Sequence, residues 1–417
     1  MAAFKSKAKL IDDIHDAEAD KTLTEKDSYI FELIKDYVVE NRSVNHQRQT
    51  ELLSALRDDQ NLIGSTVVKR LIAEAIISEY DLPQIGIDPV FIEALGHDLP
   101  AKAYPKPDGP LDKIGNLSTE VYFWGIPASG KTCAIGALLS MAFKTDLDRL
   151  QQFKEGACQG RQYMSRLTEM FPYDPREGVP ANVMPLPSGT PVKYTYEMFF
   201  ELTDKKRNVY PITFIDMAGE LVRCMYKKNK GEQLSTEEEA ALQTVTNVLK
   251  DNRTANQKLH FFVLEYGGEH RRYEGVSQTR YLLSAIDYLS NIDAGGGQRF
   301  NVFESKTDAI YLLVTQVDKA GQDDDCLASH VRSYMNGPQS YNSIANQLQN
   351  ICQTYHINGG RLAVLLFSLG EVCFKDYCRF NPRFTRNALQ TLLSHMYSYS
   401  ELQKKPWFKK FYQWMTS

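Results

Sequence analysis

Cysteine pairs and long apolar runs are both missing from this sequence of 417 residues. Its seven cysteines are scattered, odd in number and never in a C-x-x-C pair, which favours a reduced cytoplasmic compartment over a disulfide scaffold or a zinc site. No apolar run approaches the roughly 20 residues that span a bilayer, and the N-terminal residues lack the apolar centre of a signal peptide. We therefore expect a cytoplasmic protein without a transmembrane segment.

A strong net charge is lacking as well. The 48 basic and 52 acidic side chains give a net charge of −4, so no overall field draws the chain to nucleic acid or to an anionic membrane. No nucleic-acid partner is expected, and the basic run Lys227–Lys230 is short enough to be a solvated loop. The apolar and charged fractions are ordinary, so the chain should hold two or three globular domains, or one domain with large insertions.

What the sequence does contain is a phosphate-binding pattern. The octapeptide GIPASGKT matches G-x-x-x-x-G-K-S/T and lies between an apolar strand pattern and a helix pattern. Gly125 and Gly130 allow the tight turn that points successive N–H groups into one hollow, and the following helix start adds partial positive charge. Lys131 is expected to reach the β- and γ-phosphates, and the Thr132 hydroxyl to hold magnesium. The alternative is a glycine turn that only joins strand to helix. The residues predicted to bind phosphate are Gly125, Ile126, Pro127, Ala128, Ser129, Gly130, Lys131, Thr132 and Cys133.

A second pattern, DMAGE, follows at the end of the apolar strand pattern 209–216. Together with residues 192–200, this strand predicts a hairpin whose second strand is apolar enough to be central in a sheet. A carboxylate at a buried strand tip, here Asp216, can hold a magnesium-bound water beside a phosphate loop, and the Gly219 N–H can turn towards a γ-phosphate. An N-capping role is the structural alternative for Asp216.

Two further apolar strand patterns, 308–314 and 362–367, end in polar segments that decide which nucleotide fits. Their tips should meet at the carboxyl edge of the sheet, where ligands bind in open α/β folds. Asp318 can accept hydrogen bonds from the N1–H and the 2-amino group of guanine, a pair of donors that adenine does not offer. The residues predicted around the base are Thr315, Gln316, Asp318, Ser368 and Leu369.

In this order, GIPASGKT, DMAGE, TQVD and FSLG resemble the motifs of the Ras-like, TRAFAC-type P-loop GTPases over residues 115–395. The resemblance implies an α/β fold, a P-loop NTPase three-layer sandwich with a mostly parallel sheet, that binds GTP or GDP with Mg²⁺ as cofactor. The fourth motif departs from the family pattern because Gln316 stands where a lysine usually braces the phosphate loop. The fifth motif departs from S-A-K.

By the same resemblance, Thr190 is the threonine that closes on magnesium when a γ-phosphate is present, with Thr195 as the second choice. Glu220 stands where these enzymes often carry the glutamine that orients the attacking water. Its charge would oppose the γ-phosphate, so turnover should be slow without an arginine from a partner. Arg223 is expected to be a solvated surface arginine, with a role in cis as the alternative. The predicted catalytic set is Lys131, Glu220 and Thr190, and the predicted metal set is Thr132, Asp216 and Thr190.

The chain divides into four predicted regions: an all-helical N-terminal domain (1–98), a proline-rich linker (99–116), a GTPase-like domain with insertions (117–398) and an aromatic C-terminal helix (399–417). Residues 146–171 are expected to be a polar helical stretch, and a triple-glycine segment to close a later helix. A proline-rich approach ending in P-x-G-T, then a hairpin, then DxAGE resembles the bacterial double-GTPase group, although only one phosphate loop is present.

Together these motifs predict a cytoplasmic GTP-binding protein that acts as a slow GTPase switch. Loops 172–191 and 217–235 should respond to the γ-phosphate. Nucleotide state should reach a protein partner through these loops or through the helical N-terminal domain. Two alternatives stay open: a P-loop ATPase, in which Asp318 does not touch the base, and a scaffold that binds nucleotide without turnover.

Overall fold

The computed structural model describes residues 6–20, 23–39, 45–97, 105–144, 150–171, 183–187, 189–250, 256–269, 272–295, 297–321, 324–337 and 341–403. Most of the predicted switch loop 172–191, part of the predicted linker and the aromatic residues predicted to form the C-terminal helix lie outside these ranges.

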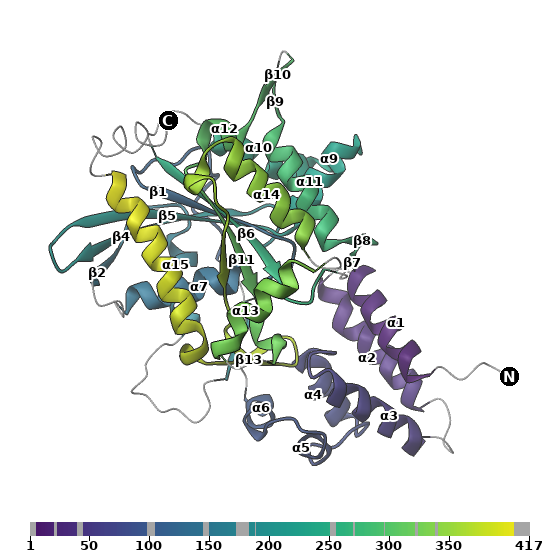
Figure 1. Cartoon of the computed structure of the whole chain (residues 1–417). Coiled ribbons are helices and arrows are strands. Elements are labelled where there is room, and N and C mark those ends of the chain that lie inside the picture. Colours follow the sequence, from purple (N-terminus) through teal and green to yellow (C-terminus); the bar gives the residue numbers. More distant parts are fainter. Residues whose placement is uncertain are drawn as a thin grey trace.

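A seven-stranded sheet runs through the centre of the protein (Figure 1). Its order is β12-β11-β6-β1-β5-β4-β2, and five neighbouring strands, from β12 to β5, are parallel. Strand β4 is antiparallel to β5, and β2 is antiparallel to β4. This mixed, mostly parallel sheet is consistent with the predicted P-loop fold. The strands are β1 (Thr119–Trp124), β2 (Leu150–Glu155), β4 (Thr195–Asp204), β5 (Val209–Met217), β6 (Gln257–Glu265), β11 (Ala309–Thr315) and β12 (Ala363–Leu366).

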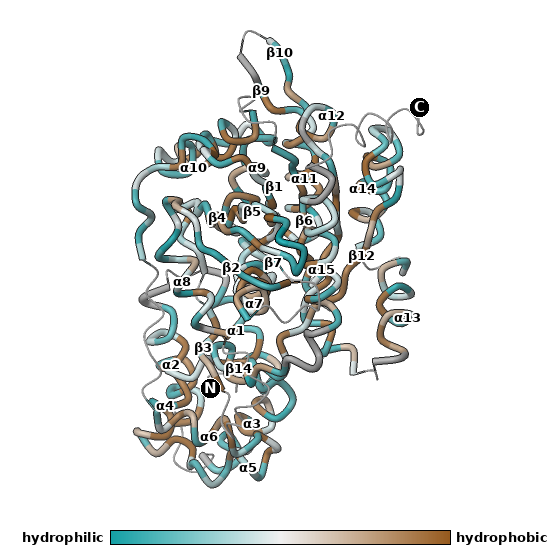
Figure 2. Tube along the Cα trace, turned by 90° about the vertical axis from the view of Figure 1, so that its left-hand side faces the viewer, coloured by the Kyte–Doolittle hydropathy of each residue, from teal (hydrophilic) through white to brown (hydrophobic). Residues whose placement is uncertain are grey.

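Helices cover both faces of the sheet because successive side chains of a strand point to opposite sides. In β1, Val121 and Phe123 join one hydrophobic cluster, whereas Tyr122 and Trp124 join another. In Figure 2 these central strands are largely brown, with helices on either side. The result is three layers. The first cluster includes side chains of α7 (Lys131–Phe143), α8 (Arg161–Met170) and α15 (Pro382–Gln403). The second includes side chains of α9 (Glu220–Lys230), α10 (Thr236–Lys250), α11 (Gln278–Ser290), α12 (Val302–Lys306), α13 (Asp324–Met335) and α14 (Asn342–Thr354).

The strand order of the sheet has a topological switch point at β1, where successive strands begin to be added on the opposite side. After β1 it forms β2, β4 and β5 on one side, and it then crosses over to form β6, β11 and β12 on the other. In open α/β sheets, ligands bind beyond the carboxyl ends of the strands at such a switch point. Strand β1 ends at Trp124, directly before the octapeptide GIPASGKT. The topology therefore places this loop where a ligand site is expected.

Two stretches differ from the sequence prediction. The stretch 146–171 is not one helix, because residues 150–155 form the edge strand β2. An edge strand with one neighbour needs few apolar residues, and here Phe153 stacks on Phe200 with ring centroids 5.2 Å apart. The expected helix end near residue 295 is instead a hairpin of β9 (Ile292–Gly295) and β10 (Gln298–Phe300), in whose turn Gly297 has a φ of +80°.

Among the described residues, six helices precede β1 in sequence. They lie beside the sheet at the lower right and bottom of Figure 1. Their buried side chains form a third hydrophobic cluster, which also takes in Val183, Cys373, Phe374 and Tyr377. These four residues belong to a small sheet of order β13-β14-β3 or to its turn, so the cluster is not formed by helices alone. The helices are α1 (Lys7–Asp20), α2 (Leu23–Val39), α3 (Asn45–Asp58), α4 (Ser65–Ala73), α5 (Asp81–Gln84) and α6 (Pro89–Leu95). The strands are β3 (Val183–Pro185), β13 (Gly370–Cys373) and β14 (Tyr377–Phe380).

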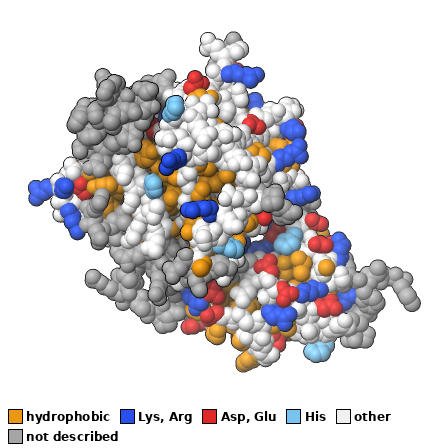
Figure 3. All heavy atoms as spheres, viewed as in Figure 1, with side chains coloured by type: hydrophobic (Ala, Val, Ile, Leu, Met, Phe, Trp, Pro, Cys, Tyr) orange, Lys and Arg blue, Asp and Glu red, His pale blue; other side chains and the backbone are white. Residues whose placement is uncertain are grey.

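The surface over the N-terminal helices mixes charges of both signs, whereas hydrophobic side chains show in the middle of the same view (Figure 3). Several of the charges pair across helices, as Lys35 does with Glu74 at 2.7 Å and Arg70 with Glu32 at 3.3 Å. Within the described part of the chain, none of the helices has the length and apolar character that crossing a membrane requires.

Candidate functional site

The loop between β1 and α7 is shaped by close backbone approach. Gly125 must lack a side chain, because an added Cβ would lie 2.6 Å from the Ser129 Oγ and 2.9 Å from the Val263 carbonyl oxygen of β6. Gly130 has a φ of +86°, and Ala128 also takes a positive φ of +60°. Gly130 has no side chain to cap the first turn of α7, and such a helix start favours a phosphate oxygen.

The amine of Lys131 lies over this loop. It donates to the carbonyl oxygens of Gly125, at 2.7 Å, and of Ile126, at 2.8 Å. The side chain is only 6% exposed, so its charge acts in surroundings with little water. An ammonium held at the mouth of a loop of N–H groups is suited to an anion. Of the other predicted loop residues, Ile126 is buried in the core, while Pro127 and Cys133 are half-buried.

The three residues predicted to hold magnesium come together at the tip of β5. The Asp216 Oδ2 accepts from the hydroxyls of Thr132 and Thr190, each at 3.3 Å, and these two hydroxyls lie 3.4 Å apart. The second choice, Thr195, has a different position at the start of β4, where its carbonyl accepts from Gln159 at 2.6 Å. The geometry therefore selects Thr190 over Thr195 as the neighbour of Asp216.

The carboxylate of Asp216 fits a hydrated magnesium ion. It is fully buried, and burial raises its pKa, while hydrogen bonds from Tyr163, Thr190 and Thr132 and the charge of Lys131 oppose the rise. Its Oδ1 is buried and has no hydrogen-bond partner among the described residues. Magnesium takes carboxylate, hydroxyl and water oxygens. An orphaned carboxylate oxygen beside two hydroxyls matches that set.

The turn after β5 contacts the phosphate loop directly. An added Cβ on Gly219 would lie 2.3 Å from the Pro127 backbone N and 2.6 Å from the Ile126 carbonyl carbon. Glu220 is the first residue of α9 and is half-buried. Its charge lies near Tyr273, where burial raises the pKa of the phenol and Glu220 adds to the rise. The predicted catalytic Glu220 thus stands one residue beyond the contact between turn and loop.

Arg223 is not the solvated arginine that the sequence suggests. Its guanidinium forms ion pairs with Glu238, at 3.0 Å, and with Glu274, and its side chain is 18% exposed. Glu238 also accepts from Lys227 at 3.0 Å and from the Ser235 backbone N at 2.9 Å. These contacts join α9 to the start of α10. The guanidinium of Arg223 is therefore held in a structural ion-pair network.

The residues predicted around the base also meet. Thr315 donates to the Ser129 carbonyl at 2.7 Å, which ties the end of β11 to the phosphate loop. Asp318 is exposed, and its Oδ1 accepts from the Ser368 hydroxyl at 2.5 Å. The Gln316 amide lies 3.5 Å from the Ala128 carbonyl, at the limit of a hydrogen bond. Leu369 differs, because its side chain packs in the hydrophobic cluster on the α7 face.

One residue of the site was missed by sequence reasoning. The phenol of Tyr163, on α8, donates to the Asp216 Oδ2 at 2.6 Å, closer than either threonine. Its ring is buried and stacks on Tyr196, with centroids 3.9 Å apart. Nothing local in the sequence marks Tyr163, because its partner lies 53 residues further along the chain.

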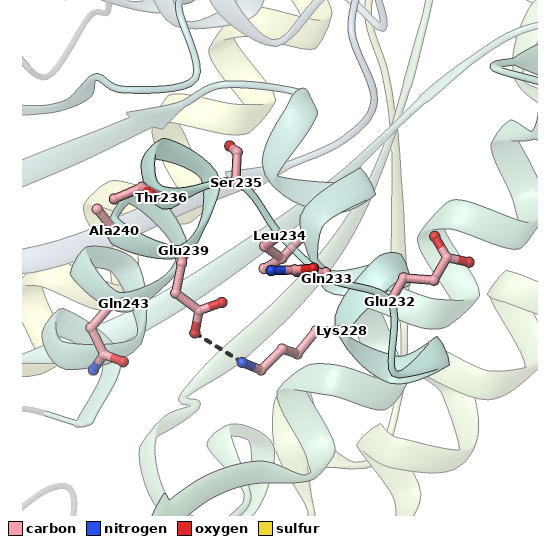
Figure 4. Close-up of a pocket in the computed structure, with 9 residues that line it drawn as sticks. All are labelled: Lys228, Glu232, Gln233, Leu234, Ser235, Thr236, Glu239, Ala240 and Gln243. Atoms are coloured by element: carbon pink, nitrogen blue, oxygen red, sulfur yellow. Dashed lines mark hydrogen bonds and ion pairs between the residues drawn. The ribbon is translucent and has the colours of Figure 1, made fainter.

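A surface hollow between α9 and α10 lies apart from these residues (Figure 4). Lys228 and Glu239 face each other within it, with an ion pair of 2.8 Å. The chain that connects the two helices supplies much of the remaining lining, within the predicted switch loop 217–235. The lining contains none of the residues predicted to bind nucleotide or magnesium, so the hollow adds nothing to that site.

Comparisons with known proteins give only distant likenesses. No family model matches the chain, and no curated protein matches its sequence. The solved Roco2 protein of Methanosarcina barkeri, bound to GDP, matches with a TM-score of 0.26 and 12% identity, over 71% of this chain and 52% of that one. The nucleolar GTP-binding protein 1 of Plasmodium falciparum matches with a TM-score of 0.25 and 11% identity, over 71% of this chain and 97% of that one. The chain thus spans about half the length of the Roco2 structure, and at scores this low the function of the site rests on its own residues.

Proposed function

We propose that this protein binds a guanine nucleotide together with magnesium and acts as a slow GTPase switch. The observation that supports it best is the meeting of Thr132, Thr190 and Asp216 beside the buried Lys131. These residues come from three separate segments, and each bears the functional group that a bound nucleoside triphosphate and its magnesium require. A turn that only joined strand to helix would not need this convergence.

The residues that would hold magnesium are Thr132, Thr190 and Asp216, the last through its orphaned Oδ1. When bound, the ion supplies neutralisation of charge on the β- and γ-phosphate oxygens. The loop from Gly125 to Cys133 would cradle the phosphates with its N–H groups, and Lys131 would turn from the loop carbonyls to the phosphates. Asp318, held by Ser368, would accept from the guanine edge.

Switching would follow from the contacts of the γ-phosphate. Thr190 would close on magnesium only in the triphosphate state, and the Gly219 N–H would approach the γ-phosphate from the opposite side. Loops 172–191 and 217–235 would therefore change together, and the N-terminal helices would present the result to a protein partner. Glu220 brings a negative charge where the attacking water would lie, so hydrolysis would be slow without a partner.

The decisive experiment is a titration with fluorescent GTP and ATP analogues in the presence of magnesium. We expect tighter binding of the guanine analogue, and a loss of at least about 10-fold in Lys131→Ala, since a hydrogen bond to a charged group contributes about 1.5–3 kcal/mol. The matched control is Lys144→Ala, an exposed lysine at the other end of the same helix. Equal affinity of wild type and Lys131→Ala would refute the proposal, and tighter ATP binding would favour an ATPase.

Turnover separates a switch from a scaffold. Phosphate release should be slow but measurable with GTP and magnesium. Binding without any phosphate release, alone or with candidate partners, would leave a nucleotide-binding scaffold as the function.

A further inference from the structure

Tyr163 lies within the proposed magnesium site without belonging to any motif. Its ring is 1% exposed and is held between α8 and β4 by the stack on Tyr196. Its hydroxyl donates to the Asp216 Oδ2 at 2.6 Å. A buried phenol hydroxyl requires a hydrogen-bond partner to offset its desolvation. A side chain that only filled the core would not need this hydroxyl. Here the partner is the carboxylate on which the proposed metal site depends.

The hydrogen bonds around Asp216 are unevenly divided between its two oxygens. Oδ2 accepts from the hydroxyls of Tyr163, Thr132 and Thr190, whereas Oδ1 is buried and has no hydrogen-bond partner in the part of the chain that the structure describes. Hydroxyls that donate their protons to a carboxylate keep lone pairs for a cation. The phenol is the shortest of the three contacts and comes from a rigid stacked ring, so it fixes which carboxylate oxygen receives the hydroxyls.

We propose that Tyr163 is a positioning residue for magnesium, which orients Asp216 so that Oδ1 faces the ion's water shell. The inference rests on the proposed nucleotide site and names a residue that the motifs do not contain. Partners that orient a metal-binding carboxylate typically change metal affinity by about 10- to 100-fold when they are removed.

The test compares Tyr163→Phe with Tyr196→Phe in the full chain loaded with a fluorescent GDP analogue. The two variants lose hydroxyls from stacked rings, but the Tyr196 hydroxyl donates to the Pro105 carbonyl at 3.1 Å and not to Asp216. We expect about 10- to 100-fold weaker magnesium binding in Tyr163→Phe alone. Affinity for the analogue in EDTA should stay unchanged, because the Tyr163 contact acts through the ion.

Equal magnesium affinity in wild type and Tyr163→Phe would overturn the inference, leaving Tyr163 as a core residue. Thermal unfolding of both variants shows whether either is misfolded. If Tyr163→Phe is misfolded, its unfolding is measured again at raised magnesium concentration. Magnesium should restore wild-type unfolding only if the lost contact serves the ion. If wild type binds no nucleotide at all, the proposed function fails first.

A second, independent observation concerns the hairpin β13–β14, which follows Ser368 directly. Its turn, Phe374-Lys375-Asp376, has two non-glycine residues with positive φ, +54° at Phe374 and +60° at Lys375. Such strain persists where the surroundings determine the conformation, and it is typical of functional segments. Phe374 is fully buried in the cluster of the N-terminal helices.

The turn is bonded to these helices at several points. The Phe374 N donates to the Gln60 carbonyl at 2.9 Å, and Lys375 forms an ion pair with Glu18. Asp376 accepts from the Ser65 backbone N at 3.0 Å and from its hydroxyl at 2.5 Å, at the start of α4. The turn is thus fixed to α1 and α4 by backbone and charged contacts.

The hairpin also has contacts on both sides of the proposed nucleotide site. Ser368, two residues before β13, donates to Asp318 at the predicted base position. Strand β14 pairs with β3, and the Leu186 N donates to the Asp376 carbonyl at 2.6 Å, four residues before Thr190. One small sheet therefore connects the proposed base and metal contacts with the N-terminal helices.

The geometry points to this sheet as the element that carries nucleotide state to the N-terminal helices, an inference that also rests on the proposed function. Hydrogen exchange should show altered protection at amides 60–65 and 374–376 when a GTP analogue with magnesium replaces GDP. Phe374→Gly, which relieves the strained φ and removes the apolar anchor, should change the ratio of GTP-analogue to GDP affinity by about 5-fold or more.

The matched control is Arg207→Gly, which relieves a positive φ of +63° in the exposed β4–β5 turn, away from the helices. It should leave the ratio unchanged. Nucleotide binding with unaltered exchange at these amides, and an unaltered ratio in Phe374→Gly, would overturn the coupling while leaving the binding site intact. If Phe374→Gly does not fold, the exchange measurement on wild type decides alone.

Discussion

Replacement of Gly219 by alanine tests the contact on which the proposed site depends. A Cβ at this position would lie 2.3 Å from the Pro127 N and 2.7 Å from its Cα, so one methyl group would collide with the backbone of the phosphate loop. The collision cannot be relieved by a side-chain rotation, because these neighbours are backbone atoms and Pro127 has a fixed φ. Either the loop or the start of α9 must move.

The expected destabilisation by Gly219→Ala can be estimated because backbone strain does not contribute to it. Gly219 has a φ of −62°, which alanine adopts freely. Backbone strain therefore contributes nothing to the change, and the whole cost is overpacking, typically about 1–3 kcal/mol. If the phosphate loop moves and the rest of the fold is unchanged, this free-energy cost corresponds to roughly 5- to 150-fold weaker nucleotide binding, at about 1.4 kcal/mol for each factor of ten.

The assay is titration of the Gly219→Ala protein with a fluorescent GDP analogue and magnesium, beside thermal unfolding. Gly115→Ala is the control, because Gly115 is exposed with an ordinary φ and an added Cβ there would meet no atom within 4 Å. We expect Gly115→Ala to behave as wild type. Wild-type affinity together with a wild-type unfolding temperature in Gly219→Ala would refute the packing of this turn against the loop.

Three further changes probe other parts of the molecule. Burial raises the pKa of Glu197 from 4.5 to about 7, so its contribution to stability is full below about pH 4.5 and is lost as the pH rises through 7. Wild type should therefore lose on the order of 3 kcal/mol of unfolding free energy across this range. The Glu197→Gln variant should not show this loss when both proteins are unfolded at each pH. Asp318→Asn should shift preference from guanosine towards xanthosine nucleotides, and an unchanged preference would separate Asp318 from the base. Arg223→Ala should lower the unfolding temperature, because it removes the pair with Glu238, yet leave GTP hydrolysis unchanged; a large loss of hydrolysis would restore a catalytic role for this arginine.

Much of the central sheet follows from local sequence pattern. Strands β1, β5, β6 and β11 are buried along nearly their whole length, and such apolar runs are visible without a structure. Strand β2 is different, because five of its six residues are exposed or half-buried, and only its pairing with β4 makes it a strand. The small sheet β13-β14-β3 is harder still, since β3 pairs with β14, which lies about 190 residues later in the sequence, and nothing local indicates this pairing.

The site divides in the same way. Lys131, Thr132 and Asp216 lie in contiguous motifs whose spacing indicates the chemistry, so the sequence alone predicts them as site residues. Thr190 came from a resemblance to a family order of motifs, and the structure places its hydroxyl 3.3 Å from the Asp216 Oδ2. Tyr163 cannot be predicted from a motif or a resemblance, because its contact with Asp216 depends on how α8 packs against β4.

The degraded TQVD motif shows why letters alone misjudge a site. In the resemblance to Ras-like GTPases, Gln316 stands where a lysine is expected. Its amide lies 3.5 Å from the Ala128 carbonyl, too long for a strong bond. The neighbouring Thr315 hydroxyl donates to the Ser129 carbonyl at 2.7 Å and is 1% exposed. A buried neutral hydrogen bond of this length can hold the loop backbone without a charge. The Thr315 hydroxyl therefore ties the end of β11 to the loop backbone, a contact that the departure at Gln316 does not remove.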